Sequence, residues 1–323
     1  MKVVNMRVEG DTRLGFCHGE FVIDPSVVAH SDLGSAARWF SDTIAFIRSG
    51  EEGLAAARRL VADPPSGARM RLTDVKLTAP IRPTTILCSG SNYRDHNAEK
   101  SNTPISGKEP EFFIKTSDCV VGPDEPIIHD PDLTKKLDCE TELAIVIGKP
   151  GRHIPVAEAL GHVFGYTIVN DVTARDLQVR TKGTLTWYET GRGKAFDSSA
   201  PLGPAIVTAD EIGDPQSLQL QTRINGELRQ SSTTANMIWT CAELIHFFSV
   251  SFTLKPGMVI ITGTPAGTAW STDAELGGSW QGLPGLSPAT RYCLPGDAIE
   301  SEIEKIGVLR NQVVDLASLA DGA

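Results

Sequence analysis

From Ile81 onward, short segments rich in β-branched and aromatic residues follow one another, and Gly or Pro bounds each of them. The clearest segments are IRPTTILCSG, EFFIK, CVVG and ELAIVIG. Runs of this length and composition are typical of β-strands. Further along, SLQLQTRING alternates apolar and polar positions before Asn225-Gly226, a pair that favours a type I′ hairpin turn. We therefore predict an α+β chain that is mainly β.

Helical spacing of apolar residues occurs in three places. Two of them precede residue 75, where they follow short strands at KVVNMRV and LGFCHGEFVID; the third is IWTCAELIHFFSV. The segment DPPSGARM (63–70) breaks the periodicity after the second of these stretches and is the best linker candidate. We therefore predict a small α+β domain over residues 1–75 and a catalytic domain over residues 76–323. The apolar positions are Phe40, Ile44, Ile47, Leu54, Ala57, Val61, Cys241, Leu244, Ile245 and Phe248.

Charge and hydrophobicity exclude several classes of function. The 30 basic and 40 acidic residues give a net charge of −10, and no run of Lys or Arg offers a patch for nucleic acid. No stretch approaches the roughly 18 apolar residues that cross a bilayer, and the N-terminus has no secretory apolar run. The six cysteines include no C-x-x-C pair, which argues against zinc-finger and thioredoxin patterns. We expect a soluble cytoplasmic protein that binds neither nucleic acid nor membrane.

Two glutamates open the strand ELAIVIG. Glu140 and Glu142 are two residues apart, so on a strand both side chains point to the same face and can converge on one cation. Two ionised carboxylates on one face repel unless a cation or proton lies between them, and their hard oxygens suit Mg²⁺, Mn²⁺ or Ca²⁺. The alternative is that one Glu simply faces solvent at the start of the strand.

A further carboxylate, Asp171, ends the strand GYTIVN. It is either a helix N-cap or a ligand presented at a strand end. Arg175 and Gln178 follow at i, i+3 on a short predicted helix, so both can face one site, where the Arg fork would suit a substrate carboxylate. The alternative for Arg175 is a surface ion pair with a neighbour such as Asp176.

His96 and Glu99 stand at i, i+3 after the strand TTILCSG, with Asn92 as the candidate N-cap of their helix. A Glu beside a His orients the ring and stabilises imidazolium, the arrangement that a water-activating base needs. The alternative is a capped surface turn with a solvated His.

Two glycine-containing segments also contain candidate residues. GRGK (191–194) lacks the Gly and Ser/Thr positions of a Walker A loop, which leaves Lys194 as a candidate catalytic cation on a flexible loop. GTPAG (263–267) is either a tight turn or a turn whose Thr264 contacts a ligand. No G-x-S-x-G, H-E-x-x-H or G-x-G-x-x-G sequence is present, which weakens the serine-hydrolase, zincin and dinucleotide interpretations.

Taken in order, these segments resemble the fumarylacetoacetate hydrolase family. The matching stretches extend over about residues 86–267: SGSNYRDHNAE, FFIKTSDCVVGPDEPI, CETELAIVIG, GYTIVNDVTARDLQ, GRGKAFDSSAPLGP, INGELRQ and LKPGMVIITGTPAG. A weaker match covers residues 294–313, and the first 75 residues resemble the variable small domain of many members.

The resemblance implies a mixed β-sandwich roll, usually as a homodimer, with a Mg²⁺ or Mn²⁺ site. The metal would be held by Glu140, Glu142 and Asp171, and His96 with Glu99 would be the water-activating dyad on a mobile lid. The substrate's oxygens would be bound by Lys194, which the resemblance counts as catalytic, and by Arg175, Gln178 and Thr264.

The activity expected first is hydrolysis of a carbon–carbon bond in an acylpyruvate-like or 2,4-dioxo acid. The second is decarboxylation or isomerisation of a related oxo-dicarboxylate, such as oxaloacetate or a 2-hydroxydienoate. A third possibility is a catalytically silent ligand-binding protein on the same scaffold. Loops 179–193 and 269–295 are longer than in small members of the family and are expected to shape the choice of substrate.

Overall fold

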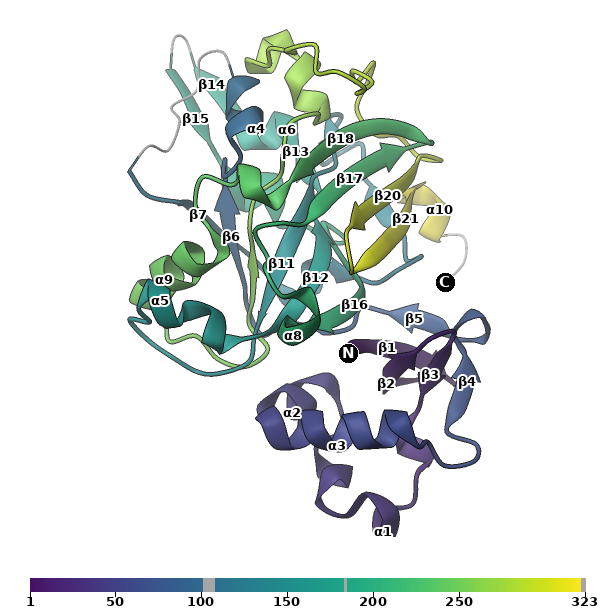
Figure 1. Cartoon of the computed structure of the whole chain (residues 1–323). Helices are drawn as coiled ribbons and strands as arrows, with labels where there is room; N and C mark the ends of the chain where they lie inside the picture. Colours follow the sequence, from purple (N-terminus) through teal and green to yellow (C-terminus); the bar gives the residue numbers. More distant parts are fainter. Residues whose placement is uncertain (101–107, 183–184, 321–323) are drawn as a thin grey trace.

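A computed structural model describes residues 1–100, 108–182 and 185–320 of the chain. It contains two main β-sheets with short helices around them, so the predicted α+β, mainly β class is confirmed (Figure 1). The larger sheet has the strand order β4 (Arg69–Arg71), β3 (Phe21–Ile23), β2 (Asp11–His18), β1 (Lys2–Val8), β16 (Ala200–Thr208), β12 (Val163–Asn170), β11 (Thr141–Ile147), β19 (Val259–Ile261), β6 (Ile86–Gly90) and β7 (Glu111–Lys115). Off this path, β5 (Lys76–Thr78) pairs with β1, and β8 (Val120–Val121) pairs with β16.

The second sheet has five strands. Their order is β18 (Glu227–Thr233), β17 (Gln219–Ile224), β20 (Ala298–Ile303), β21 (Gly307–Asp315) and β9 (Ile127–His129). Asn225 and Gly226 both have positive φ between β17 and β18, as the predicted hairpin turn requires. Two small ribbons complete the strands: β10 (Leu137–Asp138) with β13 (Thr173–Ala174), and β14 (Val179–Lys182) with β15 (Leu185–Tyr188).

The helices are short. The first predicted amphipathic stretches form α2 (Thr43–Arg48) and α3 (Gly50–Ala62), and the third forms α9 (Cys241–Ser251), which Thr240 and Glu243 begin with a reciprocal capping box. The remaining helices are α1 (His30–Leu33), α4 (Arg94–Ala98), α5 (Val156–Ala159), α6 (Arg175–Gln178), α7 (Thr190–Lys194), α8 (Ala209–Ile212) and α10 (Ala317–Ala320).

Strand β11 is buried on both faces and organises the core around it. Leu143, Ile145 and Ile147 pack in a cluster with residues of the second sheet, such as Leu220. The alternate positions Ala144 and Val146 pack in another cluster, on the opposite face of the strand. Because side chains alternate along a strand, Glu142 shares the face of Ala144, whereas Thr141 points to the second sheet.

The N-terminal strands continue the larger sheet. Lys2 and Val3 of β1 pair with Val207 and Ile206 of β16, and the Phe46 ring lies 5.7 Å from that of Phe164 on β12. The boundary between residues 1–75 and 76–323 stays a prediction, and one hydrophobic cluster contains residues from both sides of it.

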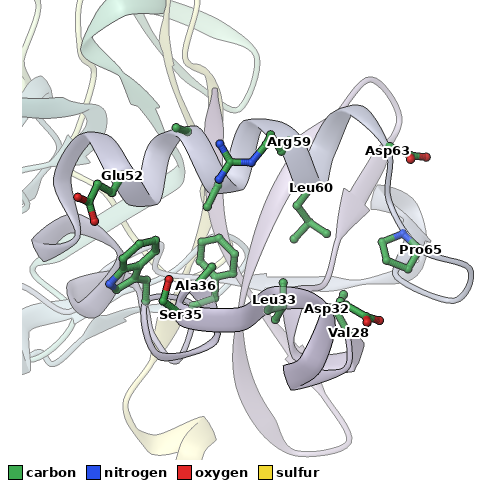
Figure 2. A pocket seen from close by; sticks show the side chains of 14 residues that line it. Val28, Asp32, Leu33, Ser35, Ala36, Glu52, Arg59, Leu60, Asp63 and Pro65 are labelled. Carbon is green, nitrogen blue, oxygen red and sulfur yellow. The ribbon is translucent and has the colours of Figure 1, made fainter.

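A surface cavity of about 530 Å³ lies within the N-terminal residues, between α3 and the segment that contains Leu33 and Ala36 (Figure 2). Apolar side chains such as Trp39, Phe40 and Leu60 line it, together with Arg59. In Figure 1, α2 and α3 lie at one end of the molecule, and α4 and β14 lie at the other end. None of the candidate site residues from the sequence lines this cavity.

The segment 269–295 is irregular, as predicted, but it is not entirely a surface loop. It begins with the 3₁₀ turns η7 (Ala269–Thr272) and η8 (Ala274–Leu276), and Trp270 is only 3% exposed. The indole Nε1 donates to the Leu276 carbonyl oxygen at 2.9 Å. Burial of this ring brings the segment against the candidate site.

In the described part of the chain, no helix is both long enough and apolar enough to cross a membrane.

Candidate active site and metal centre

Three carboxylates converge where β11 begins and β12 ends. Thr141 pairs with Asn170, and beside this pair the Asp171 amide donates to the Glu140 carbonyl oxygen at 2.8 Å. The register of the two strands therefore places Asp171 next to Glu140 and Glu142. One oxygen from each side chain lies within 4.8 Å of the others, and all three residues are buried.

The alternatives that the sequence left open for these residues, a solvent-facing Glu and an Asp171 N-cap, are both wrong. Neither glutamate is at the surface, and helix α6 begins after Ala174 without a side-chain cap, so Asp171 is not its N-cap. Thr141, between the two glutamates, instead donates to Ser301 Oγ of the second sheet at 2.7 Å. The strand alternation that the sequence predicted separates a structural residue from two site residues.

Buried cations neutralise part of this negative charge. Lys194 Nζ lies 2.5 Å from Glu140 Oε2 and 2.6 Å from Asp171 Oδ2, and Lys115 Nζ lies 2.8 Å from Asp171 Oδ1. Lys194 is buried at the end of α7, so the prediction of a flexible loop is wrong. Its ammonium connects two of the three carboxylates.

The charges act differently on the two glutamates. Burial by itself raises the pKa of Glu140, but Arg175 and Lys194 outweigh it and hold that pKa well below its usual range. Burial raises the pKa of Glu142, and the neighbouring Asp171 and Glu140 raise it further. Among the described residues no cation forms an ion pair with Glu142, whose Oε2 accepts from the Gly263 amide at 2.6 Å.

This set of oxygens fits a divalent cation. Three carboxylates at such distances are the hard ligands that Mg²⁺ and Mn²⁺ prefer, and a cation between them would remove the repulsion that raises the pKa of Glu142. Glu140, Glu142 and Asp171 are the residues that would hold it.

Arg175 is held by two acids and an amide. Its Nε donates to Asp138 Oδ2 at 2.9 Å, Nη1 donates to Gln178 Oε1 at 2.9 Å, and Nη2 donates to Glu140. The predicted pairing of Arg175 and Gln178 on one helical face is confirmed, and the surface ion pair with Asp176 is wrong. The Arg is buried, with its guanidinium carbon 5.2 Å from the Trp270 ring centre.

His96 and Glu99 also meet as their spacing predicts. His96 Nδ1 lies 3.3 Å from Glu99 Oε2, and the Gly267 amide donates to Glu99 Oε1 at 2.9 Å. Both side chains are buried, so the solvated-turn alternative is wrong. Burial lowers the pKa of His96 and raises the pKa of Glu99 to about 8, so burial favours the neutral form of both partners.

Asn92 does not cap this helix, contrary to the sequence prediction. Tyr93 occupies the N-cap position of α4 without a side-chain bond. The Asn92 amide instead donates to the carbonyl oxygens of Trp239 and Thr262, at 2.9 and 2.8 Å. Asn92 therefore fixes the end of β6, from which α4 begins, to the strand β19 and its following turn.

One cavity of about 30 Å³ collects most of the candidate residues. His96, Arg175, Gln178, Lys194, Thr264 and the three carboxylates line it, and Glu99 lies behind His96. The Thr264 hydroxyl donates to the Thr141 carbonyl oxygen and accepts from Gln230, so within the protein it is already engaged. The roles of these residues stay predictions, but their convergence supplies acids, bases and anion-binding cations in one space.

Four charged residues of the site could not be found from the sequence motifs: Lys100, Glu111, Lys115 and Asp138. A signal existed for two of them. In EFFIK the alternate residues Glu111, Phe113 and Lys115 share one face, while Phe112 and Ile114 are exposed, so a strand pattern with its polar face inward marks the site. Asp138, which also accepts from the amides of Ala269 and Trp270, had no such signal.

The chain is similar to known proteins of one family. The fumarylacetoacetate (FAA) hydrolase C-terminal family model matches residues 85–314. The oxaloacetate tautomerase FAHD2B of Bos taurus is 40% identical over 273 residues, 84% of this chain and 79% of the relative. The oxaloacetate tautomerase YisK of Bacillus subtilis is 40% identical over 275 residues, 83% of this chain and 84% of the relative.

Two solved structures share the fold over nearly the whole chain. The fumarylacetoacetate hydrolase of Exiguobacterium antarcticum has a TM-score of 0.74 and 37% identity, and covers 98% of this chain and 99% of its own. The maleylpyruvate hydrolase of Sphingobium sp. SYK-6, solved with manganese(II) and pyruvate, has a TM-score of 0.72 and 27% identity, with coverage of 98% and 99%. On the extent of the family match and the identity to these relatives, this chain belongs to the fumarylacetoacetate hydrolase family.

Proposed function

We propose that this protein is a divalent-metal-dependent tautomerase, which interconverts the keto and enol forms of oxaloacetate or a closely related small oxo-dicarboxylate. The observation that carries the proposal is the His96–Glu99 pair beside three carboxylates around a cavity of about 30 Å³. The 40% identity to oxaloacetate tautomerases supports the same substrate class.

Tautomerisation requires a proton to leave C3 of the oxo acid and a proton to reach the oxygen on C2. A Mg²⁺ or Mn²⁺ ion held by Glu140, Glu142 and Asp171 would supply Lewis acidity toward that oxygen. His96 is the base for the C3 proton, because its ring lines the cavity and Glu99 holds Nδ1. Glu99 holds the His96 ring at Nδ1 while His96 carries the C3 proton to the C2 oxygen, so the exchange needs no further proton.

The cations around the cavity bind and orient the substrate. Arg175 and Lys194 lie against Glu140, so a carboxylate next to the C2 oxygen would meet both of them. Gln178, fixed by its bond to Arg175, adds an amide at the same wall of the cavity. Trp270, Phe113 and Tyr188 close the remaining sides and limit the water that reaches the reacting carbons.

Hydrolysis of a carbon–carbon bond in an acylpyruvate-like acid is the second candidate. The buried His96–Glu99 pair that moves a proton in tautomerisation is also the pair that deprotonates water in hydrolysis. A structural relative at 27% identity is a maleylpyruvate hydrolase, which favours keeping this candidate. Decarboxylation of oxaloacetate needs the same stabilisation of enolate charge without attack by water.

The experiment is to supply Mn²⁺-loaded protein with the enol form of oxaloacetate and follow the loss of enol absorbance, while pyruvate and CO₂ are measured in the same samples. We expect faster loss of enol with no change in total oxaloacetate. His96→Gln should abolish the acceleration, and Lys149→Met, an exposed lysine, should leave it unchanged.

Each candidate predicts a different product. Formation of CO₂ with pyruvate would establish decarboxylation, and cleavage of an acylpyruvate into pyruvate and a second acid would establish hydrolysis. If the protein binds substrate but accelerates none of these reactions, the silent binding protein is correct and the tautomerase proposal is wrong.

A further inference from the structure

Lys100 lines the same cavity as the three carboxylates but forms no ion pair with an acid among the described residues. The other lining cations, Arg175 and Lys194, are both bonded to carboxylates. Lys100 Nζ instead donates to Ser91 Oγ at 2.5 Å and lies 5.5 Å from the Trp270 ring centre. The chemistry described above makes no use of this ammonium.

The partner of Lys100 is held in an unusual backbone conformation. Ser91 has a φ of 53°, in the left-handed region that non-glycine residues seldom adopt, and its hydroxyl donates to Glu111 Oε2 at 2.9 Å. A Cβ on Gly90 would lie 2.7 Å from the same Glu111 oxygen, so glycine lets Glu111 approach. Because the Ser91 proton goes to Glu111, the Ser91 oxygen is left to accept from Lys100.

Among the described residues, the other N–H donors of the Lys100 ammonium therefore have no acceptor. Lys has three N–H donors, and Ser91 accepts one of them. Burial lowers the pKa of Lys100 to about 8, while Glu111 acts in the opposite direction and favours the charged form. A partly dehydrated ammonium with free donors at the edge of a cavity attracts an anion.

The main chain around Lys100 is also fixed. The Ser279 amide donates to the Glu99 carbonyl oxygen at 2.8 Å, and Lys100 forms a β-bridge with Gly278. The segment 269–295 thus sets the position of the ammonium relative to His96. Through this contact, changes in the segment 269–295 would move the ammonium and so alter which substrates bind.

We propose that Lys100 binds the substrate carboxylate farthest from the metal ligands and so selects 2-oxo acids with a second carboxylate at C4. This inference rests on the proposed function, because it assigns the two carboxylates of that substrate to different cations of one cavity. The C1 carboxylate and C2 oxygen lie toward Glu140, Glu142 and Asp171, and the C4 carboxylate meets the two donors of Lys100 that no described residue accepts. A neutral group at C4 leaves those donors without a partner.

The test compares oxaloacetate with its 4-methyl ester in wild-type protein, Lys100→Met, Lys100→Arg and the control Lys149→Met, all loaded with Mn²⁺. We expect Lys100→Met to lower kcat/KM for oxaloacetate about 10- to 100-fold, the effect of one hydrogen bond between charged groups, mainly through KM. The ester should change less than about threefold in the same variant. Lys100→Arg should recover most of the preference, and Lys149→Met should match the wild type.

Equal losses for acid and ester, or no loss for the acid, would overturn the inference. Failure of the proposed function looks different, because then the wild type accelerates tautomerisation of neither oxaloacetate nor its 4-methyl ester. In that case calorimetric binding of oxaloacetate and its ester to the Mn²⁺-loaded proteins still decides the role of Lys100. Selective weakening of oxaloacetate binding in Lys100→Met supports it, whereas equal weakening of both compounds, or no weakening of either, overturns it.

Discussion

Replacing Lys115 with Met tests how the protein tolerates three carboxylates so close together. Lys115 has no exposed surface, and its ammonium lies 2.8 Å from Asp171 Oδ1 and 2.9 Å from the Ser199 carbonyl oxygen. Removing one partner of a buried ion pair costs about 3–5 kcal/mol, because the other charge remains buried. Asp171 keeps its bond to Lys194 at 2.6 Å, so we expect the lower end, about 3 kcal/mol.

Urea unfolding in the absence and presence of Mn²⁺ measures this loss. Without metal, Lys115→Met should lower the free energy of unfolding by about 3 kcal/mol relative to the wild type, and the exposed control Lys149→Met should change it by less than about 0.5 kcal/mol. Mn²⁺ should stabilise Lys115→Met more than the wild type, because the variant has one positive charge fewer beside Asp171. A loss below about 1 kcal/mol, or equal stabilisation by Mn²⁺ in both proteins, would refute this account of the charges.

Three further predictions follow from the contacts of the site and the sheet. Glu99→Gln should lower the turnover rate about 10²- to 10⁴-fold. The wild-type rate should rise with pH to a plateau above about 8, as Glu99 loses its proton, and the pH–rate profile of the variant should lack that rise. Gly267→Ala should reduce both stability and turnover, because the new Cβ would lie 1.9 Å from the Arg229 carbonyl oxygen, at a backbone φ of 105°. The clash would displace the Gly267 amide that donates to Glu99. A thermal unfolding temperature and a turnover rate that match the wild type would contradict this. Residues 76–323 expressed alone should aggregate, because removal of β1 uncovers the edge of β16 and the Phe164 ring; a soluble fragment with cooperative unfolding would instead show an independent domain.

Much of the fold could be predicted from the sequence, because its signals are local. The alternation around Asn225-Gly226 specifies a hairpin, and Cys241, Leu244, Ile245 and Phe248 specify one face of α9. The pairing of β1 with β16 could not be predicted, since it joins residues about 200 positions apart and depends on which sheet edge is free.

The site residues also divide into those that neighbouring residues predict and those that depend on distant contacts. Glu140 with Glu142, and His96 with Glu99, have the spacing of a strand face and a helix face, so their convergence could be read from neighbouring residues. Asn92 was misassigned as a cap because its actual partners, Trp239 and Thr262, are distant in sequence. The contacts of Lys115 and Lys194 with Asp171 could not be predicted, because they depend on how β7 and α7 pack beside the paired strands β11 and β12.

Titration of the metal-free protein with Mn²⁺, followed by calorimetry and by the rate of oxaloacetate tautomerisation in the same samples, decides whether the three carboxylates hold a catalytic metal. We expect one ion per chain, a rate that rises in proportion to occupancy, and loss of both in Glu142→Gln, because this carboxylate has no cationic partner among the described residues. Lys149→Met should bind Mn²⁺ and catalyse as the wild type does. Absence of Mn²⁺ binding in the wild type, or unchanged binding and rate in Glu142→Gln, would contradict it.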